Sequence, residues 1–290
     1  SFIAYNTATN NDHGISLSAS DYATILNNNA TSNNVGISLW GSDWCDIFDN
    51  TASDNSGTGI YLSSSNYNNI TWNLAERNKY GVYLSSSSFN NIFSNTARFN
   101  SFGISLMWFS NHNTVMDNDA KLCIYYGAYL FVADYNIVVH NDFSSSGSVG
   151  IYLEQSNDNQ IIENNATSAG NYGINLFESD RNLIDLNDVK FGTDIGIELS
   201  SSNYNNVTNN IAQESDVGIS IRFSSNNRIM RNQAVGNDIG VYLLRSSSNI
   251  MLENNASANN NVGIDLSLSD FNEIIGNIVD ENPNYGIHLY

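Results

Sequence analysis

Six ionisable side chains near the middle of this 290-residue sequence are of the types that acid/base chemistry on a sugar requires. They are predicted to point outward from the core, and they are His140, Glu163, Glu154, Glu198, Arg222 and Arg231. Sugar-cleaving enzymes use paired groups that give and take a proton. The pair to test first is His140 with Glu163, because we expect them at the same outward position of the second strand in successive repeats. Solvated surface charge is the competing explanation.

Aromatic side chains suggest a second kind of site. The candidates for stacking on sugar rings are Trp40, Trp72, Tyr61, Tyr83, Tyr129 and Tyr152. A further series falls in turns and consists of Tyr22, Trp44, Tyr67, Phe89 and Tyr135. Rings in a row would suit an extended glycan, but rings stacked on one another also stabilise a repeat protein. For the turn series we favour the structural explanation.

Acidic and amide side chains recur in the same turns. They are Asp21, Asp43, Asn66, Asn111, Asp134, Asn157, Asp180, Asn203 and Asp270. Their oxygens could bind calcium, whereas ordinary turn chemistry explains Asp and Asn equally well. We therefore expect no cofactor, and calcium is the one metal to test.

A repeat that runs through the whole chain must position these residues. A glycine is followed by an aliphatic residue, a free position and a second aliphatic residue, and successive copies are 22, 23 or 24 residues apart. The glycines are Gly14, Gly36, Gly59, Gly81, Gly103, Gly127, Gly150, Gly173, Gly196, Gly218, Gly240, Gly263 and Gly286. Further along each copy an aliphatic residue precedes an asparagine by three positions. These asparagines are Asn28, Asn50, Asn73, Asn95, Asn118, Asn141, Asn164, Asn187, Asn210, Asn232, Asn254 and Asn277.

The repeat predicts three short strands per copy, which cannot bury their apolar faces alone. Copies stacked in parallel would share one core, so we predict an all-β, single-stranded parallel β-helix (solenoid) of about 13 coils. An asparagine amide carries donors and an acceptor and can bond to its neighbours at every level of a stack. We therefore predict internal Asn and Ser ladders. The coils should form one domain over residues 1–290, a segment of a longer protein.

The coil pattern "G-I-x-L…N-x-I-x-x-N-x-A" resembles the right-handed parallel β-helix repeat of NosD-like proteins and of carbohydrate-binding and sugar-hydrolase solenoids. It is also similar to repeats in cell-surface proteins of methanogenic archaea. The resemblance covers essentially the whole chain. It implies a right-handed helix, an extracellular or cell-surface location and a polysaccharide or cell-surface glycan as partner.

Composition narrows the possible partners. Twenty-nine acidic residues against ten basic ones give a formal charge of −19. Nucleic acids and anionic membranes need clustered Lys and Arg, so neither is an expected partner. No apolar stretch approaches the ~20 residues of a spanning helix. The two cysteines, Cys45 and Cys123, fall about three repeats apart, too far for a disulfide.

The spacing of the repeats bears on catalysis. It never exceeds 24 residues, which leaves no room for the long loops that build clefts in enzymes of this architecture. We therefore expect a non-catalytic extracellular module that is structural and binds glycans or associates with itself end to end. One alternative is a polysaccharide lyase, hydrolase or epimerase acting on the outer face of the middle coils. The other is a building block of a surface layer or sheath.

Overall fold

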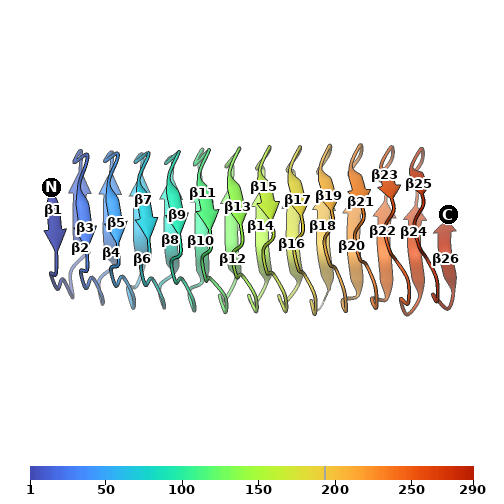
Figure 1. The fold of residues 1–290 in the computed structure, drawn as a ribbon, viewed down its shortest axis with the longest axis horizontal. Helices are drawn as coiled ribbons and strands as arrows, with labels where there is room; N and C mark the ends of the chain where they lie inside the picture. The colour runs from blue at the N-terminus through green and yellow to red at the C-terminus, as the bar shows by residue number, and fades with distance from the viewer. Residues whose placement is uncertain (193) are drawn as a thin grey trace. The chain divides into compact units, whose positions relative to one another are not determined.

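The computed structural model describes residues 1–192 and 194–290. The regular elements in this part of the chain are all β-strands, and short strands alternate with long ones (Figure 1). The chain divides into two compact units, residues 1–143 and residues 144–290. Both units are built from the same coil.

In residues 1–143 the strands form two parallel sheets. The long-strand sheet contains β2 (His13–Ser18), β4 (Val35–Trp40), β6 (Thr58–Ser63), β8 (Tyr80–Ser85), β10 (Phe102–Met107) and β12 (Tyr126–Phe131). The short-strand sheet contains β1 (Phe2–Ala4), β3 (Thr24–Leu26), β5 (Asp46–Phe48), β7 (Asn69–Thr71), β9 (Asn91–Phe93), β11 (Thr114–Met116) and β13 (Ile137–Val139). Each strand pairs with the equivalent strand of the next coil, so equivalent residues become neighbours.

Residues 144–290 repeat this arrangement. The long-strand sheet contains β14 (Val149–Glu154), β16 (Tyr172–Phe177), β18 (Ile195–Ser200), β20 (Val217–Arg222), β22 (Ile239–Leu244), β24 (Val262–Ser267) and β26 (Tyr285–Leu289). The short-strand sheet contains β15 (Gln160–Ile162), β17 (Leu183–Asp185), β19 (Asn206–Thr208), β21 (Arg228–Met230), β23 (Ile250–Leu252) and β25 (Glu273–Ile275). Pairing is again parallel and in register.

The third side of the coil differs from the predicted third strand. It is a row of isolated parallel bridges, such as Thr7↔Asn29 and Asp188↔Ile211. Left-handed residues flank each bridge; for Asn29 they are Asn27 at φ 50° and Ser32 at φ 58°. They interrupt the extended backbone, so the pairing is limited to one residue. In every other respect the predicted parallel β-solenoid is confirmed.

The interior combines aliphatic side chains with the predicted ladder of asparagines. Asn210 is fully buried; its Nδ2 donates to the Ile184 carbonyl at 2.8 Å and to Asn232 Oδ1 at 3.0 Å. Its backbone N–H donates to the same Asn232 oxygen at 2.9 Å, and its own Oδ1 accepts the equivalent bonds from Asn187. The ladder thus satisfies backbone groups that the turns would otherwise leave buried and unpaired.

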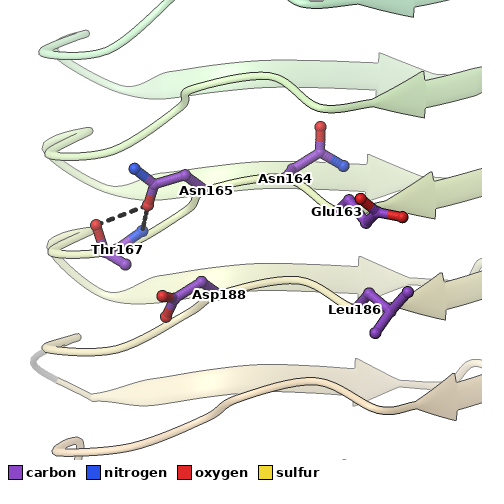
Figure 2. A pocket seen from close by; sticks show the side chains of 6 residues that line it. All are labelled: Glu163, Asn164, Asn165, Thr167, Leu186 and Asp188. Atoms are coloured by element: carbon purple, nitrogen blue, oxygen red, sulfur yellow. Dashed lines mark hydrogen bonds between the residues drawn. The ribbon is translucent and has the colours of Figure 1, made fainter.

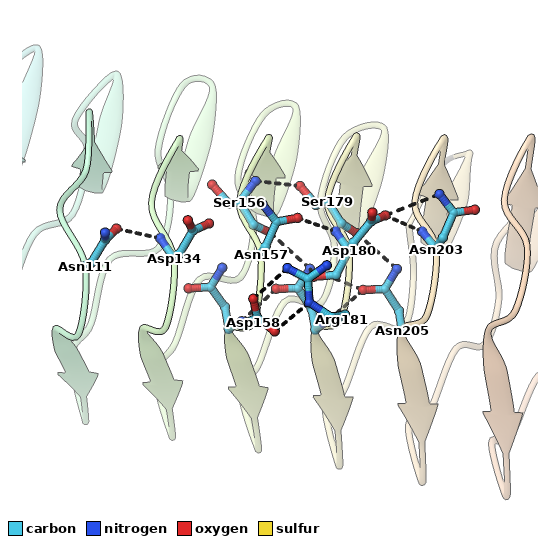
Figure 3. A network of polar contacts seen from close by, with 12 residues as sticks. Asn111, Asp134, Ser156, Asn157, Asp158, Ser179, Asp180, Arg181, Asn203 and Asn205 are labelled. Atoms are coloured by element: carbon cyan, nitrogen blue, oxygen red, sulfur yellow. Dashed lines mark hydrogen bonds and ion pairs between the residues drawn. The ribbon is translucent and has the colours of Figure 1, made fainter.

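The Asp and Asn side chains of the outer turns form a second ladder with the opposite direction. Asn157 Oδ1 accepts the N–H of Asp180 at 2.8 Å, and Asp180 Oδ1 accepts the N–H of Asn203 at 2.6 Å (Figure 3). Here the acceptor lies in the lower-numbered coil, whereas in the interior ladder it lies in the higher-numbered coil. Asn111 and Asp134 make the same contact at 2.7 Å within residues 1–143. These oxygens therefore cap backbone N–H groups.

The repeated glycine permits close packing inside the coil. A Cβ atom on Gly81 would lie 2.5 Å from Asn100 Nδ2 and 2.6 Å from the Gly103 carbonyl oxygen. The glycine and the aliphatic residue after it therefore both face inward. As a result the first, fourth and sixth residues of a long strand lie on its outer face, as the stacked rings of Tyr80 and Tyr83 show.

Candidate functional site

The outer face of the long-strand sheet in residues 144–290 carries a row of polar side chains. Asn175, Glu198 and Ser220 are the fourth residues of β16, β18 and β20 and are direct neighbours in register. Arg222, the sixth residue of β20, and Tyr172, the first residue of β16, lie beside them. We call Tyr172, Asn175, Glu198, Ser220 and Arg222 the Glu198 cluster.

Glu198 is the most unusual group of this cluster. Only 6% of its side chain is exposed, and the Nε of Arg222 lies 3.4 Å from its Oε1. Burial raises the pKa of the Glu198 carboxyl above its usual range, although the charge of Arg222 and a hydrogen bond from the Tyr172 hydroxyl both oppose the shift. Burial also raises the pKa of Tyr172, and the nearby Glu198 charge adds to that effect. Perturbed acids of this kind concentrate at functional sites.

Several polar atoms around Glu198 have no hydrogen-bond partner within the described residues. They are Asn175 Oδ1, Ser220 Oγ and Arg222 Nε, and all three are buried. The contact of Arg222 Nε with Glu198 is thus an ion pair without the alignment of a hydrogen bond. Buried groups of this type normally have partners, and leaving one unpaired costs about 1–3 kcal/mol.

The other four predicted acid/base residues lie on other elements. Glu154 is the last residue of β14, and Arg231 follows β21, where its Nε contacts Glu253 Oε2 at 2.8 Å in an exposed ion pair. His140 belongs to residues 1–143, with its Nδ1 3.8 Å from Asp117 Oδ1, whereas Glu163 belongs to residues 144–290.

His140 and Glu163 differ from the prediction in their local structure. They were expected on a strand, but each follows a short strand, with φ of 56° and 52°. The left-handed residue turns the chain so that the next one, Asn141 or Asn164, points into the core and joins the ladder. The roles proposed for the six acid/base candidates stay predictions.

A hollow in the surface of residues 144–290 contains Glu163. Its volume is about 750 Å³, and Figure 2 shows its lining of Glu163, Asn164, Asn165, Thr167, Leu186 and Asp188. Thr167 donates to Asn165 Oδ1 through its hydroxyl at 2.8 Å and its backbone N–H at 3.2 Å. Asp188 Oδ2 lies 3.0 Å from Lys190 Nζ. The hollow combines acceptors with the exposed apolar side chain of Leu186.

The predicted sugar-stacking residues gather mainly on the long-strand sheet of residues 1–143. Trp40, Tyr61 and Tyr83 come from β4, β6 and β8 and lie in contact. The Trp40 and Tyr61 rings meet edge to face at 5.1 Å, and those of Tyr61 and Tyr83 stack at 5.2 Å. Tyr129 on β12 lies 6.4 Å from the ring of Phe102. Tyr152 is on β14 in the other unit.

Trp72 lies apart from these rings, after the short strand β7. Its ring is 5.2 Å from Phe48, at 57°, and 56% of the residue is exposed. Phe48 also lines a hollow of about 340 Å³, whose other lining residues are Thr24, Leu26, Asp46, Asn69, Thr71 and Asn91. The hollow could not be recognised in the sequence, because its residues come from four short strands and share no residue type.

The aromatic residues of the turns form a regular stack. Trp44, Tyr67, Phe89, His112 and Tyr135 follow one another with centroid distances of 4.4, 5.0, 4.8 and 5.0 Å and interplanar angles of 5° to 8°. Each inner ring is covered on both faces by its neighbours, so a sugar could reach only the edges. His112 was not among the predicted turn aromatics, because histidine differs from the Phe, Tyr and Trp residues that define that series.

Two family models match the sequence. The first, described as periplasmic copper-binding protein (NosD), matches residues 1–101 and 90–191. The second, described as right handed beta helix region, matches residues 156–290. No curated protein matches the chain.

The residues present do not fit a copper centre. Copper in proteins is held by clustered His, Cys and Met side chains, and the described residues include no group of three or more His, Cys, Asp or Glu placed to hold a metal ion. Cys45 and Cys123 are both buried thiols that form no disulfide, as expected. Calcium binding by the turn carboxylates stays a prediction.

Solved structures resemble the chain in fold. The A-module of mannuronan C-5 epimerase AlgE6 from Azotobacter vinelandii is 16% identical over 99% of this chain and 88% of its own, with a TM-score of 0.65. The Dettilon tailspike protein is 14% identical over 99% of this chain and 61% of its own, with a TM-score of 0.58. The surface protein and adhesin PfbA from Streptococcus pneumoniae is 11% identical over 99% of this chain and 91% of its own, with a TM-score of 0.56.

No helix in the described residues is long and apolar enough to cross a membrane. Since the NosD model matches residues 1–191, the chain belongs to the NosD-like family of right-handed parallel β-helix proteins.

Proposed function

We propose that this chain is a non-catalytic glycan-binding module that works in the periplasm or at the cell surface. The location is supported by the family description as periplasmic and by the likeness to a surface adhesin. A glycan partner is supported by the likeness to an epimerase that acts on mannuronan. The regular coils support the absence of catalysis, because successive strands are joined without large insertions.

The single observation that carries the proposal is the aromatic outer face of residues 1–143. Tyr61 and Tyr83 are register partners on neighbouring long strands, and Trp40 lies on the strand before them, paired with Ser63. Trp40 is 41% exposed, and its edge-to-face contact leaves part of a ring face open. An aromatic face is a good platform for the C–H groups of a sugar ring, because both surfaces are apolar and flat. A row of platforms on successive coils suits an extended chain.

The test is a binding assay on residues 1–290 with a panel of neutral and acidic polysaccharides. The supernatant is also examined by mass spectrometry for shortened, unsaturated or epimerised products. We expect binding without product. Trp40→Ala should weaken binding about tenfold, or about 1.4 kcal/mol. The matched control is Tyr204→Ala, which removes an exposed aromatic ring from a turn of the other unit.

A second candidate function is a polysaccharide-active enzyme. The observation that favours it is the buried Glu198 carboxyl beside Arg222 and Tyr172, whose raised pKa suits a general acid. Product that appears with the natural protein and disappears with Glu198→Gln would replace the binding proposal with this one. Absence of both binding and product would favour the building block of a surface layer or sheath.

A further inference from the structure

The Glu198 cluster has the features of a binding site for a ligand rich in hydroxyl groups. We propose that it is a subsite for one uncharged sugar residue, whose hydroxyls donate to Glu198 and Asn175 once the Arg222 side chain moves aside. This inference rests on the proposed glycan-binding function and adds the class of glycan and a second contact point.

The first support is the burial of polar groups on the outer face. Along the fourth positions of the strands, Ser220 lies between the larger side chains of Glu198 and Tyr242. Ser220 is fully buried and only 6% of the Glu198 side chain is exposed, so neighbouring side chains cover both groups. A ligand can reach them only when one of these side chains moves.

The second support is the imbalance between donors and acceptors. Asn175 Oδ1 and Ser220 Oγ are buried without a hydrogen-bond partner in the part of the chain that the structure describes. Glu198 receives one hydrogen bond, from Tyr172. A sugar with vicinal hydroxyls offers two adjacent donors and can also accept, so it would satisfy these atoms together. An apolar ligand would leave them buried and unpaired, at a cost of about 1–3 kcal/mol each.

Arg222 is the residue that can open the site. Its side chain is 37% exposed, and its Nε lies 3.4 Å from Glu198 without hydrogen-bond alignment. Because Glu198 is buried, moving the guanidinium away would leave its carboxylate without a partner unless ligand hydroxyls take the place of Arg222. After the movement it can still donate to a ligand oxygen from the rim of the site.

Charge decides between neutral and acidic sugars. Residues 144–290 hold 18 acidic and 6 basic residues, and the site is itself built around a carboxylate. A uronate would meet this field with the wrong sign. A cation is disfavoured locally because Arg222 contacts the same carboxylate. The ligand class that avoids both the repulsion of an anion and the competition of a cation with Arg222 is an uncharged ring that bears hydroxyl groups.

The experiment is calorimetric titration of residues 1–290 with neutral hexasaccharides of glucose and of mannose and with hexagalacturonate, at low and high salt. We expect at least one neutral hexasaccharide to bind, with an affinity that salt leaves nearly unchanged. Glu198→Gln should weaken this binding at least tenfold, because it removes charge-assisted hydrogen bonds. Ser220→Val should weaken it as well, because it replaces the unpaired Oγ with a methyl group and adds bulk next to Glu198 without changing the charge.

Glu253→Gln is the matched control. It removes the carboxylate of the exposed pair with Arg231 in the same unit and should leave affinity unchanged. Circular dichroism and thermal melting verify that each variant is folded.

Natural affinity in both Glu198→Gln and Ser220→Val, together with a loss in Trp40→Ala, would refute the subsite and leave the proposed function standing. No binding of any neutral or acidic glycan to the natural protein would refute both. Preferred, Glu198-dependent binding of hexagalacturonate would overturn the neutral class.

Discussion

Residues 1–143 and residues 144–290 have interiors of the same kind but present different outer faces. Both have Asn ladders, inward Ile and Leu side chains and parallel in-register strands. All four tryptophans and the aromatic rows belong to the first unit, whereas 18 of the 29 acidic residues and the Glu198 cluster belong to the second. The coil therefore fixes only its inward positions, and outward positions are free to carry different chemistry. Functional differences along the chain should appear in those outward residues.

The largest expected effect tests whether the two interiors are equivalent. Asn95→Ala and Asn210→Ala each remove a fully buried ladder amide from one unit. Each variant leaves buried carbonyl and N–H groups without partners, so we expect a loss of about 2–4 kcal/mol in the free energy of unfolding. Denaturant titration measures it. Asn206→Ala, at an exposed position of the same coil as Asn210, should cost no more than about 0.5 kcal/mol. A large loss in only one unit would contradict the equivalence of the two interiors.

The next effect separates the two aromatic groups of residues 1–143. Trp44→Ala removes a ring from the turn stack and should lower the free energy of unfolding by about 1–2 kcal/mol, the range expected for aromatic pairs together with lost burial. Trp40→Ala should cost less stability but more glycan affinity. The comparison needs chemical denaturation and binding measured on the same two variants. If Trp44→Ala impaired binding and left stability intact, the division between stacked and sugar-facing rings would be wrong.

A smaller effect concerns the pH dependence of stability, to which Glu198 contributes in residues 144–290. The folded pKa of Glu198 is raised, so above the usual value of 4.5 the native state binds this proton more tightly than the unfolded state does. The contribution of Glu198 to stability is therefore full below pH 4.5 and is lost as pH rises through the folded pKa. Melting temperatures measured upward from pH 4 should fall for the natural protein relative to Glu198→Gln. Parallel pH profiles for the two proteins would show that the carboxyl is not perturbed.

The smallest signal comes from two thiols that only residues 1–143 contain. Burial raises the pKa of Cys45 and raises that of Cys123 to about 12, so little reactive thiolate forms at neutral pH. A chromogenic disulfide reagent should detect almost no thiol in the native protein and two thiols after denaturation. Rapid reaction of either cysteine in the native protein would indicate local opening of its coil.

The fold could be predicted from the sequence because the inward positions repeat with little variation. Gly81, its following aliphatic residues and Asn95 have equivalents in nearly every coil, and each has one physical role. The single-residue bridges could not be predicted, because they depend on left-handed residues such as Asn27 and Ser32 whose side chains have no common type.

The Glu198 cluster was predictable only in part. Glu198 and Arg222 stood among the candidates because ionisable types attract attention in a sequence. Tyr172 was missed for a geometric reason: strict alternation would place it inside, two residues before Ile174. The glycine between them also faces inward, and the alternation shifts so that Tyr172 reaches the outer face beside Glu198. His140 lies outside its strand for a similar local reason, because its backbone adopts a left-handed conformation.

The in-register pairing of equivalent residues has a consequence for how such a chain can change its length. The strands of each unit pair with the equivalent strands one period earlier or later. Removal or duplication of one complete period therefore rejoins the chain at equivalent positions and preserves both ladders. Insertion of a partial period would rotate every following side chain out of phase. Such genes can thus lengthen or shorten by whole periods under selection, and the number of outward binding positions changes with each step.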